Sequence, residues 1–93
     1  MTIGVLELRL AIREALDLKG KRRILKSLKD RLRQEFNISV AEVGRQDAHQ
    51  HSVLGVAVVA TDGRFADQVL SQVVNFVRAN HWVQLVDFSV EKY

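Results

Sequence analysis

Apolar and polar side chains alternate in residues 3–13, which read IGVLELRLAIR. This period of two is typical of a strand with one buried face. In residues 18–36 the apolar side chains recur every three or four positions instead, which predicts an amphipathic helix. Asp17 directly precedes this segment, and its carboxylate can accept a hydrogen bond from a backbone N–H of the first turn, so we expect it to be the N-cap.

The rest of the chain predicts three further strands and a second helix. Residues 38–43 favour a strand, the polar residues 44–51 a hairpin-type loop, and the almost wholly apolar residues 52–61 a central strand covered on both faces. Asp62 is a second candidate N-cap, and residues 82–93 favour a final strand. The intervening helix presents one apolar stripe, which consists of Ala66, Val69, Leu70, Val73 and Val77.

The predicted order is strand, helix, strand, strand, helix, strand, in a single domain that spans residues 1–93. This is the order of the α+β ferredoxin-like fold, βαββαβ, in which two helices cover one face of a four-stranded antiparallel sheet. The other face is open, and the third strand presents apolar residues to it whichever way the strand is turned. The two alternatives are Val53, Gly55, Ala57 and Val59, or Leu54, Val56, Val58 and Ala60.

An open apolar sheet face on a small domain is typical of an interface. We therefore expect a homo-oligomer that assembles through this face, most simply a two-fold dimer. The alternative is that charged residues of the first strand, such as Glu7 and Arg9, keep the domain soluble on its own.

Positive charge is concentrated in residues 19–33, which read KGKRRILKSLKDRLR. This segment holds eight basic residues and one acidic residue, whereas the rest of the chain holds six basic and ten acidic residues. The net charge of +3 therefore conceals a basic segment on a mildly acidic domain. On a helical wheel, four basic side chains form one ridge about 16 Å long. These are Arg22, Lys26, Lys29 and Arg33.

This ridge has little acidic compensation, because we expect Asp30 and Glu35 to lie off it. Lys19 and Lys21 add positive charge in the first turn, where the helix dipole favours acidic residues. We expect these two lysines to complete an anion site with the free N–H groups of the helix start. Three interpretations of the basic segment stay open: contact with a polyanion, an ordinary solvated helix face, or contact with an acidic protein.

Structured or ribosomal RNA is the polyanion that fits this segment best. RNA-binding domains of similar fold stack bases on aromatic side chains of the first and third strands, and neither strand here contains Phe, Tyr or Trp. A basic helix without aromatic residues suits phosphate contacts instead. The alternative function is an oligomeric protein-interaction module with no role in binding nucleic acid.

Other classes of function have little support in the residues. Ser27 and Ser39 have no evident catalytic partner, and no glycine-rich phosphate loop follows a strand, so we expect no enzyme activity and no cofactor. His49 and His51 are possible metal ligands, but a third ligand is not evident and their role stays open. We expect Trp82 to cover the edge of the core.

The sequence also favours the cytoplasm. No apolar run reaches the roughly 18–20 residues of a membrane span, and the first residues lack the pattern of a signal peptide. The chain contains no Cys, which fits a reducing compartment. We therefore expect a cytoplasmic protein without membrane contact.

Two fragments resemble the YlxP-like family, a bacterial family of small domains of unknown function. Residues 18–44, LKGKRRILKSLKDRLRQEFNISVAEVG, are similar to the family patterns S-L-K-E-K-R, L-K-S-L-K and F-N-x-S-V-A-E. Residues 53–62, VLGVAVVATD, resemble the third strand of the family and the cap that follows it. Asp17 stands where the family has Ser, and Gly20 where it has Glu, so the capping box of the family is incomplete here.

The resemblance implies a ferredoxin-like fold and an association with translation. Genes of the family often lie beside those for translation initiation factor two and a ribosome-binding factor. This association agrees in direction with a basic helix that contacts RNA. The resemblance implies no catalytic residues.

Overall fold

The computed structural model describes all residues of the chain, 1–93. Its elements are β1 (Thr2–Ala11), α1 (Leu18–Glu35), β2 (Ser39–Gly44), β3 (His51–Ala60), α2 (Gly63–Arg78) and β4 (Gln84–Lys92). The order of strands and helices is the predicted one. The two helices begin directly after Asp17 and Asp62, as the capping pattern of the sequence predicts.

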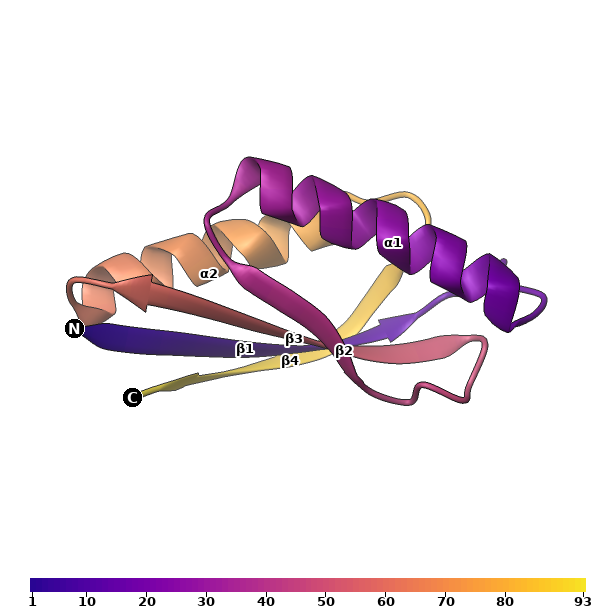
Figure 1. The fold of residues 1–93 in the computed structure, drawn as a ribbon, viewed down its shortest axis with the longest axis horizontal. Coiled ribbons are helices and arrows are strands. Elements are labelled where there is room, and N and C mark those ends of the chain that lie inside the picture. Colours follow the sequence, from indigo (N-terminus) through magenta and orange to yellow (C-terminus); the bar gives the residue numbers. More distant parts are fainter.

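The four strands form one sheet in the order β2-β3-β1-β4, and every neighbouring pair is antiparallel. Both helices cover the same face, so the molecule has two layers (Figure 1). This arrangement is the α+β ferredoxin-like fold and confirms the prediction from the sequence. α1 packs over β2, while α2 packs mainly over β1 and β3. The basic helix therefore lies beside the shortest strand, at one edge of the sheet.

The core lies between the sheet and the helices. Alternate residues of β1 and β3 face the helices, and Leu6, Leu8 and Leu54 among them are fully buried. Leu28 of α1 and Leu70 of α2 close the core from the other side and are also buried. Burying a leucine stabilises a fold by about 1.5–3 kcal/mol, so this cluster supplies much of the driving force for folding.

Both helices begin at the predicted aspartates. The Asp17 carboxylate accepts a hydrogen bond from the backbone N–H of Gly20 at 2.7 Å, and the Asp62 carboxylate accepts one from Phe65 at 2.9 Å. Each bond satisfies one of the N–H groups that have no partner within the first turn of a helix. Neither helix is long and apolar enough to cross a membrane.

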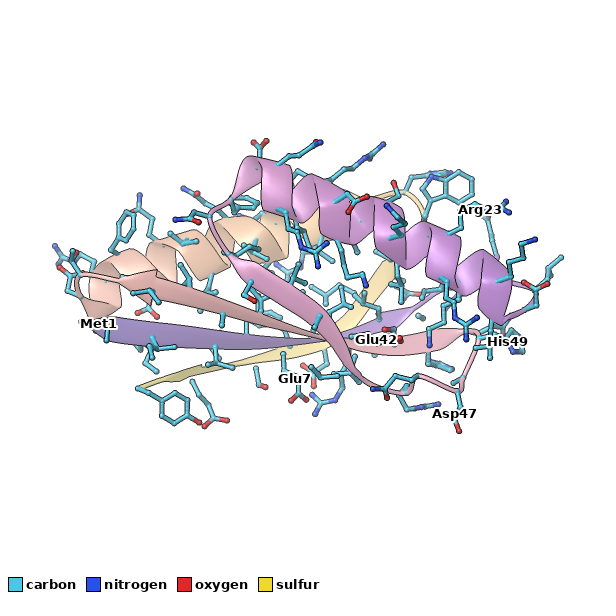
Figure 2. The ribbon with its side chains drawn as sticks, in the orientation of Figure 1. Met1, Glu7, Arg23, Glu42, Asp47 and His49 are labelled. Atoms are coloured by element: carbon cyan, nitrogen blue, oxygen red, sulfur yellow. The ribbon has the colours of Figure 1, made fainter.

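The strand register decides which set of β3 residues faces the open side of the sheet. Leu54 and Val56 are buried against the helices, which leaves the alternate residues for the open side. Those residues are Val53, Gly55, Ala57 and Val59. Val59 is 66% exposed, and Val43 of β2, which neighbours Gly55 on the same side, is 55% exposed. Figure 2 shows Glu7 on this open side, so the face combines apolar and charged residues.

The final strand contains an irregularity that simple alternation does not predict. Arg9 pairs with Asp87 and Leu10 pairs with Leu85, so Val86 has no partner on β1 and forms a bulge. Val86 is 61% exposed. The bulge changes the face of the sheet to which the residues before it would otherwise point. It lies on an edge strand, where bulges are common.

Candidate anion-binding surface

Four basic residues of α1 lie together on the side of the helix that faces β2. They are Arg22, Lys26, Lys29 and Arg33, and we call them the basic ridge. With Leu25, Asp30 and Glu42 they line a shallow hollow of ≈ 490 Å³ between the helix and the strand. Helical periodicity places them there, because the leucine stripe faces the sheet and the ridge follows it round the helix by about 100°. The structure thus brings together all four residues that the sequence predicts for the ridge.

Asp30 joins the ridge, so the prediction that it would lie off it is wrong. Its carboxylate accepts a hydrogen bond from Lys26 Nζ at 2.9 Å and a longer one from Arg33 Nη1 at 3.5 Å. The hydrogen bond from Lys26, with the positive charges of Lys26, Arg33 and Lys29, lowers the pKa of the Asp30 carboxyl. Asp30 is therefore ionised at neutral pH and offsets one of the four ridge charges.

Arg33 is held at one end of the ridge. Its Nη2 donates a hydrogen bond to the backbone carbonyl of Val40 in β2 at 2.9 Å. The guanidinium is thereby tied across the gap between helix and strand, while about half of the side chain stays exposed. A guanidinium has five N–H donors, so Arg33 keeps donors for an external anion.

Lys21 is not part of the ridge, and its predicted role in an anion site is wrong. The residue is 1% exposed. Its Nζ donates hydrogen bonds to the backbone carbonyls of Arg45 at 2.7 Å and Ala48 at 2.6 Å, and lies 2.8 Å from Glu42 Oε2. These three oxygens replace the water that a buried ammonium loses. Lys21 therefore ties α1 to the loop between β2 and β3.

Helical spacing alone could have placed Lys21 inside. It precedes Leu25 by four positions and Leu28 by seven, so it lies on the apolar stripe that faces the sheet. A lysine is rarely fully buried unless its charge is paired. Its partners come from residues more than 20 positions away, and no local pattern indicates them.

Glu42 and Ser52 complete a polar network that no pattern in the sequence indicates. Ser52 Oγ donates a hydrogen bond to Glu42 Oε2 at 2.7 Å, and Ser52 is itself buried. Figure 2 shows Glu42 on β2, beneath α1. Because Lys21 pairs with Glu42, the negative charge of Glu42 does not offset the positive charge of the ridge. The ridge keeps four cations against Asp30 alone.

The start of α1 differs from the predicted anion site. Lys19 is exposed, as expected. The Asp17 carboxylate, however, already occupies the N–H of Gly20 and brings negative charge to the first turn. With Lys21 turned inward, Lys19 is the one predicted residue at this end that remains available to a ligand. The predicted residues that remain available to an anion are therefore Lys19 and the four of the ridge.

The remaining candidates lie elsewhere. Figure 2 shows His49 in the exposed loop between β2 and β3, near the start of α1. No group of three His, Asp or Glu side chains is arranged to hold a metal ion in the structure. Trp82 does not cover the core edge as predicted, because it is 50% exposed and its indole borders an open pocket.

Comparison with known protein families identifies the family of the chain. The profile of the family described as protein of unknown function (DUF503) matches residues 3–90. The chain belongs to this family. The Uncharacterized protein YlxP of Bacillus subtilis (strain 168) is 35% identical over 75 residues, which cover 81% of this chain and 82% of that relative. The resemblance to the YlxP-like family is thereby confirmed.

Solved structures support the fold of this DUF503 member. The de novo designed protein Foldit4 aligns with a TM-score of 0.55 and 14% identity, covering 100% of this chain and 97% of the design. The de novo designed protein LFR1 1, described as having a ferredoxin fold, aligns with a TM-score of 0.52 and 15% identity over 100% of this chain and 83% of the design. These similarities concern the fold alone.

Proposed function

We propose that the protein binds structured RNA through phosphate contacts made by the basic ridge, without catalysis. The observation that carries this proposal is the charge balance of the hollow between α1 and β2. Four cations line it, and Asp30 is the one carboxylate left to offset them once Lys21 has paired with Glu42. An ordinary solvated helix face interleaves acidic and basic residues more evenly, because like charges four positions apart weaken a helix.

The shape of the ridge suits a nucleic-acid backbone. It extends for about 16 Å along the helix, long enough to contact several successive phosphates of one strand. Lys26, whose side chain is 77% exposed, can follow a flexible backbone, whereas Arg33 is held in place by β2. Phosphate contacts position a protein without reading sequence, so binding should be salt-dependent and weakly sequence-selective.

A role in translation, in the cytoplasm, is the setting we propose for this activity. It rests on the resemblance to the YlxP-like family and on the gene neighbourhood of that family. Ribosomal RNA is the structured RNA that this setting supplies. If the ridge instead contacts an acidic protein, RNA binding should not depend on the ridge residues.

The test is RNA binding by a charge-reversed ridge. The Lys26→Glu/Lys29→Glu variant should lose affinity for purified ribosomal subunits and for an RNA duplex between about 50 and 200 mM salt. The slope of the logarithm of its binding constant against the logarithm of the salt concentration should fall by about one for each phosphate that the variant no longer neutralises. The matched control is Arg31→Glu/Arg64→Glu, which changes the net charge equally at exposed positions off the ridge. An equal fall in affinity in both variants, or no binding by the wild type at low salt, would overturn the proposal.

Self-association through the open sheet face is a second candidate function. Val43 and Val59 are more than half exposed there, and Ile3 is 37% exposed. Burial of these residues against a second copy would remove apolar surface from water. Sedimentation equilibrium should then give a dimer that the Val43→Glu/Val59→Glu variant converts to a monomer. A wild-type monomer at high protein concentration would exclude this candidate.

A further inference from the structure

A pocket beside Trp82 lies outside the basic ridge. Its volume is ≈ 340 Å³, and it is formed by the middle of the β1–α1 loop, the first half of α1 and the loop before β4. Trp82, Ile24 and Ala15 give it apolar walls. Arg23, Ser27 and Glu14 line the same pocket and are exposed. An aromatic plane thus borders a pocket that also contains a guanidinium, a hydroxyl and a carboxylate.

This combination matches the chemistry of a nucleotide. A flat base stacks on an indole, a guanidinium pairs with the adjoining phosphate, and a carboxylate accepts hydrogen bonds from the base edge. We propose that the pocket binds an unpaired nucleobase of RNA, with the base on Trp82 and its phosphate at Arg23. Proteins recognise single-stranded loops and bulges of RNA in this way, because only unpaired bases can be splayed out.

The indole of Trp82 contacts one neighbouring ring, and the backbone of Trp82 makes one hydrogen bond. The His81 ring packs edge-on against Trp82, with ring centroids 5.1 Å apart and an interplanar angle of 84°. The backbone N–H of Trp82 donates a hydrogen bond to Asn80 Oδ1 at 2.8 Å. The contact with His81 leaves Trp82 50% exposed, so part of the indole remains free to meet a base.

α1 contributes residues to both the pocket and the ridge. The inference of base binding rests on the proposed RNA binding by the ridge. At 100° per residue, Lys19 and Arg23 lie on the part of α1 between the ridge and Ser27. Figure 2 shows Arg23 on the side of α1 away from the sheet. An RNA segment whose phosphates follow the ridge can therefore continue over Arg23 and place one unpaired base against Trp82.

The carboxylate of Glu14 favours some bases over others. It accepts hydrogen bonds and offers none when ionised, so it favours base edges that carry several N–H donors. Guanine presents an N–H and an amino group side by side, whereas uracil presents one N–H. We therefore expect an unpaired guanosine to bind more tightly than an unpaired uridine.

The fluorescence of Trp82 provides the test, because the chain has a single tryptophan. The probes are an RNA hairpin with one bulged guanosine, the same hairpin with an abasic residue at the bulge, and inorganic polyphosphate. Affinity is measured by anisotropy of the labelled hairpin and stacking by quenching of the tryptophan emission. Trp82→Leu removes the stacking surface, and Ser27→Gln narrows the pocket from an exposed helix position while leaving Trp82 in place.

The wild type should bind the guanosine hairpin about 5- to 100-fold more tightly than the abasic one, with quenched emission. Both variants should abolish this difference while keeping their affinity for polyphosphate. Equal affinities for the two hairpins with unchanged emission would overturn the inference and, if they still depended on Lys26 and Lys29, leave the proposed function standing. Absence of binding to hairpins and polyphosphate alike would overturn both.

Discussion

Lys21 and Lys26 are the same residue type, five positions apart on one helix, in opposite environments. Lys21 is 1% exposed and its ammonium contacts three protein oxygens, whereas the Lys26 side chain is 77% exposed and contacts Asp30 alone. Five positions rotate a side chain by about 140° round a helix, which carries it from the sheet side to solvent. Position on the helix, not the density of charge in the sequence, decides which basic residues can meet a ligand.

The two lysines also differ in what their removal leaves behind. Around Lys21, the loop carbonyls of Arg45 and Ala48 and the Glu42 carboxylate would lose a donor in a region with little water. Without Lys26, water would take the place of its ammonium at the exposed Asp30 carboxylate. An exposed ion pair of this kind contributes little to stability. Three measurements test this contrast, from the largest expected effect to the smallest.

Replacing each lysine by methionine gives the largest contrast. Lys21→Met should lower the free energy of unfolding by about 3 kcal/mol, because a partly buried carboxylate and two carbonyls are left without their donor. Lys26→Met should change it by less than about 0.5 kcal/mol. Urea unfolding followed by circular dichroism measures both. Small and equal decreases would mean that water replaces the Lys21 ammonium without penalty.

A double variant tests whether Lys21 and Glu42 act as a neutral pair. Lys21→Met/Glu42→Gln should be more stable than the sum of the two single changes predicts, by about 1 kcal/mol, because neither charge is left alone. Its affinity for RNA should equal that of the wild type, since a positive and a negative charge leave together. A marked decrease in RNA affinity would show that Lys21 contributes to the ridge after all.

Asp30 gives the smallest effect and a pH dependence. Hydrogen bonding by Lys26 lowers the pKa of Asp30 in the folded state, so its contribution to stability is present above its ordinary pKa of about 4 and is lost as pH falls through the lowered value. Between about pH 5 and pH 2, the range in which carboxyl groups titrate, acid should lower the melting temperature of the Asp30→Asn variant less than that of the wild type. The variant lacks the carboxyl group whose protonation destabilises the fold. It should also bind RNA more tightly, because the ridge loses its one offsetting charge. The control is Asp47→Asn in an exposed loop, which should follow the wild type.

The order of elements and the two N-caps were predictable because each depends on neighbours in the sequence. Alternation, helical spacing and the position of Asp17 and Asp62 require no knowledge of distant residues. The ridge was predictable for the same reason. The choice of β3 residues for the open face was not, because both alternatives are apolar and only the register with β1 separates them.

Two of the features that the sequence did not predict depend on distant partners. Lys21 is buried because the loop between β2 and β3 supplies its acceptors, and Val86 bulges because of its pairing with β1. Asp30 lies close to Lys26 and Arg33 in the sequence, but the reach of these long side chains, not their Cα positions, brings its carboxylate into the ridge. Trp82 stays half exposed while its neighbour Val83 is buried, a division between two apolar residues that the sequence pattern does not decide.

The burial of Lys21 also has a consequence for chemical labelling. Reagents that acylate amines need a free, solvent-accessible nitrogen, so Lys26 should react in the native protein while Lys21 stays protected. Lys21 becomes accessible when the loop of residues 45–50 separates from α1, since that loop supplies two of its acceptors. Where Lys21 is acylated faster than the whole domain unfolds, the rate measures how often this loop opens locally.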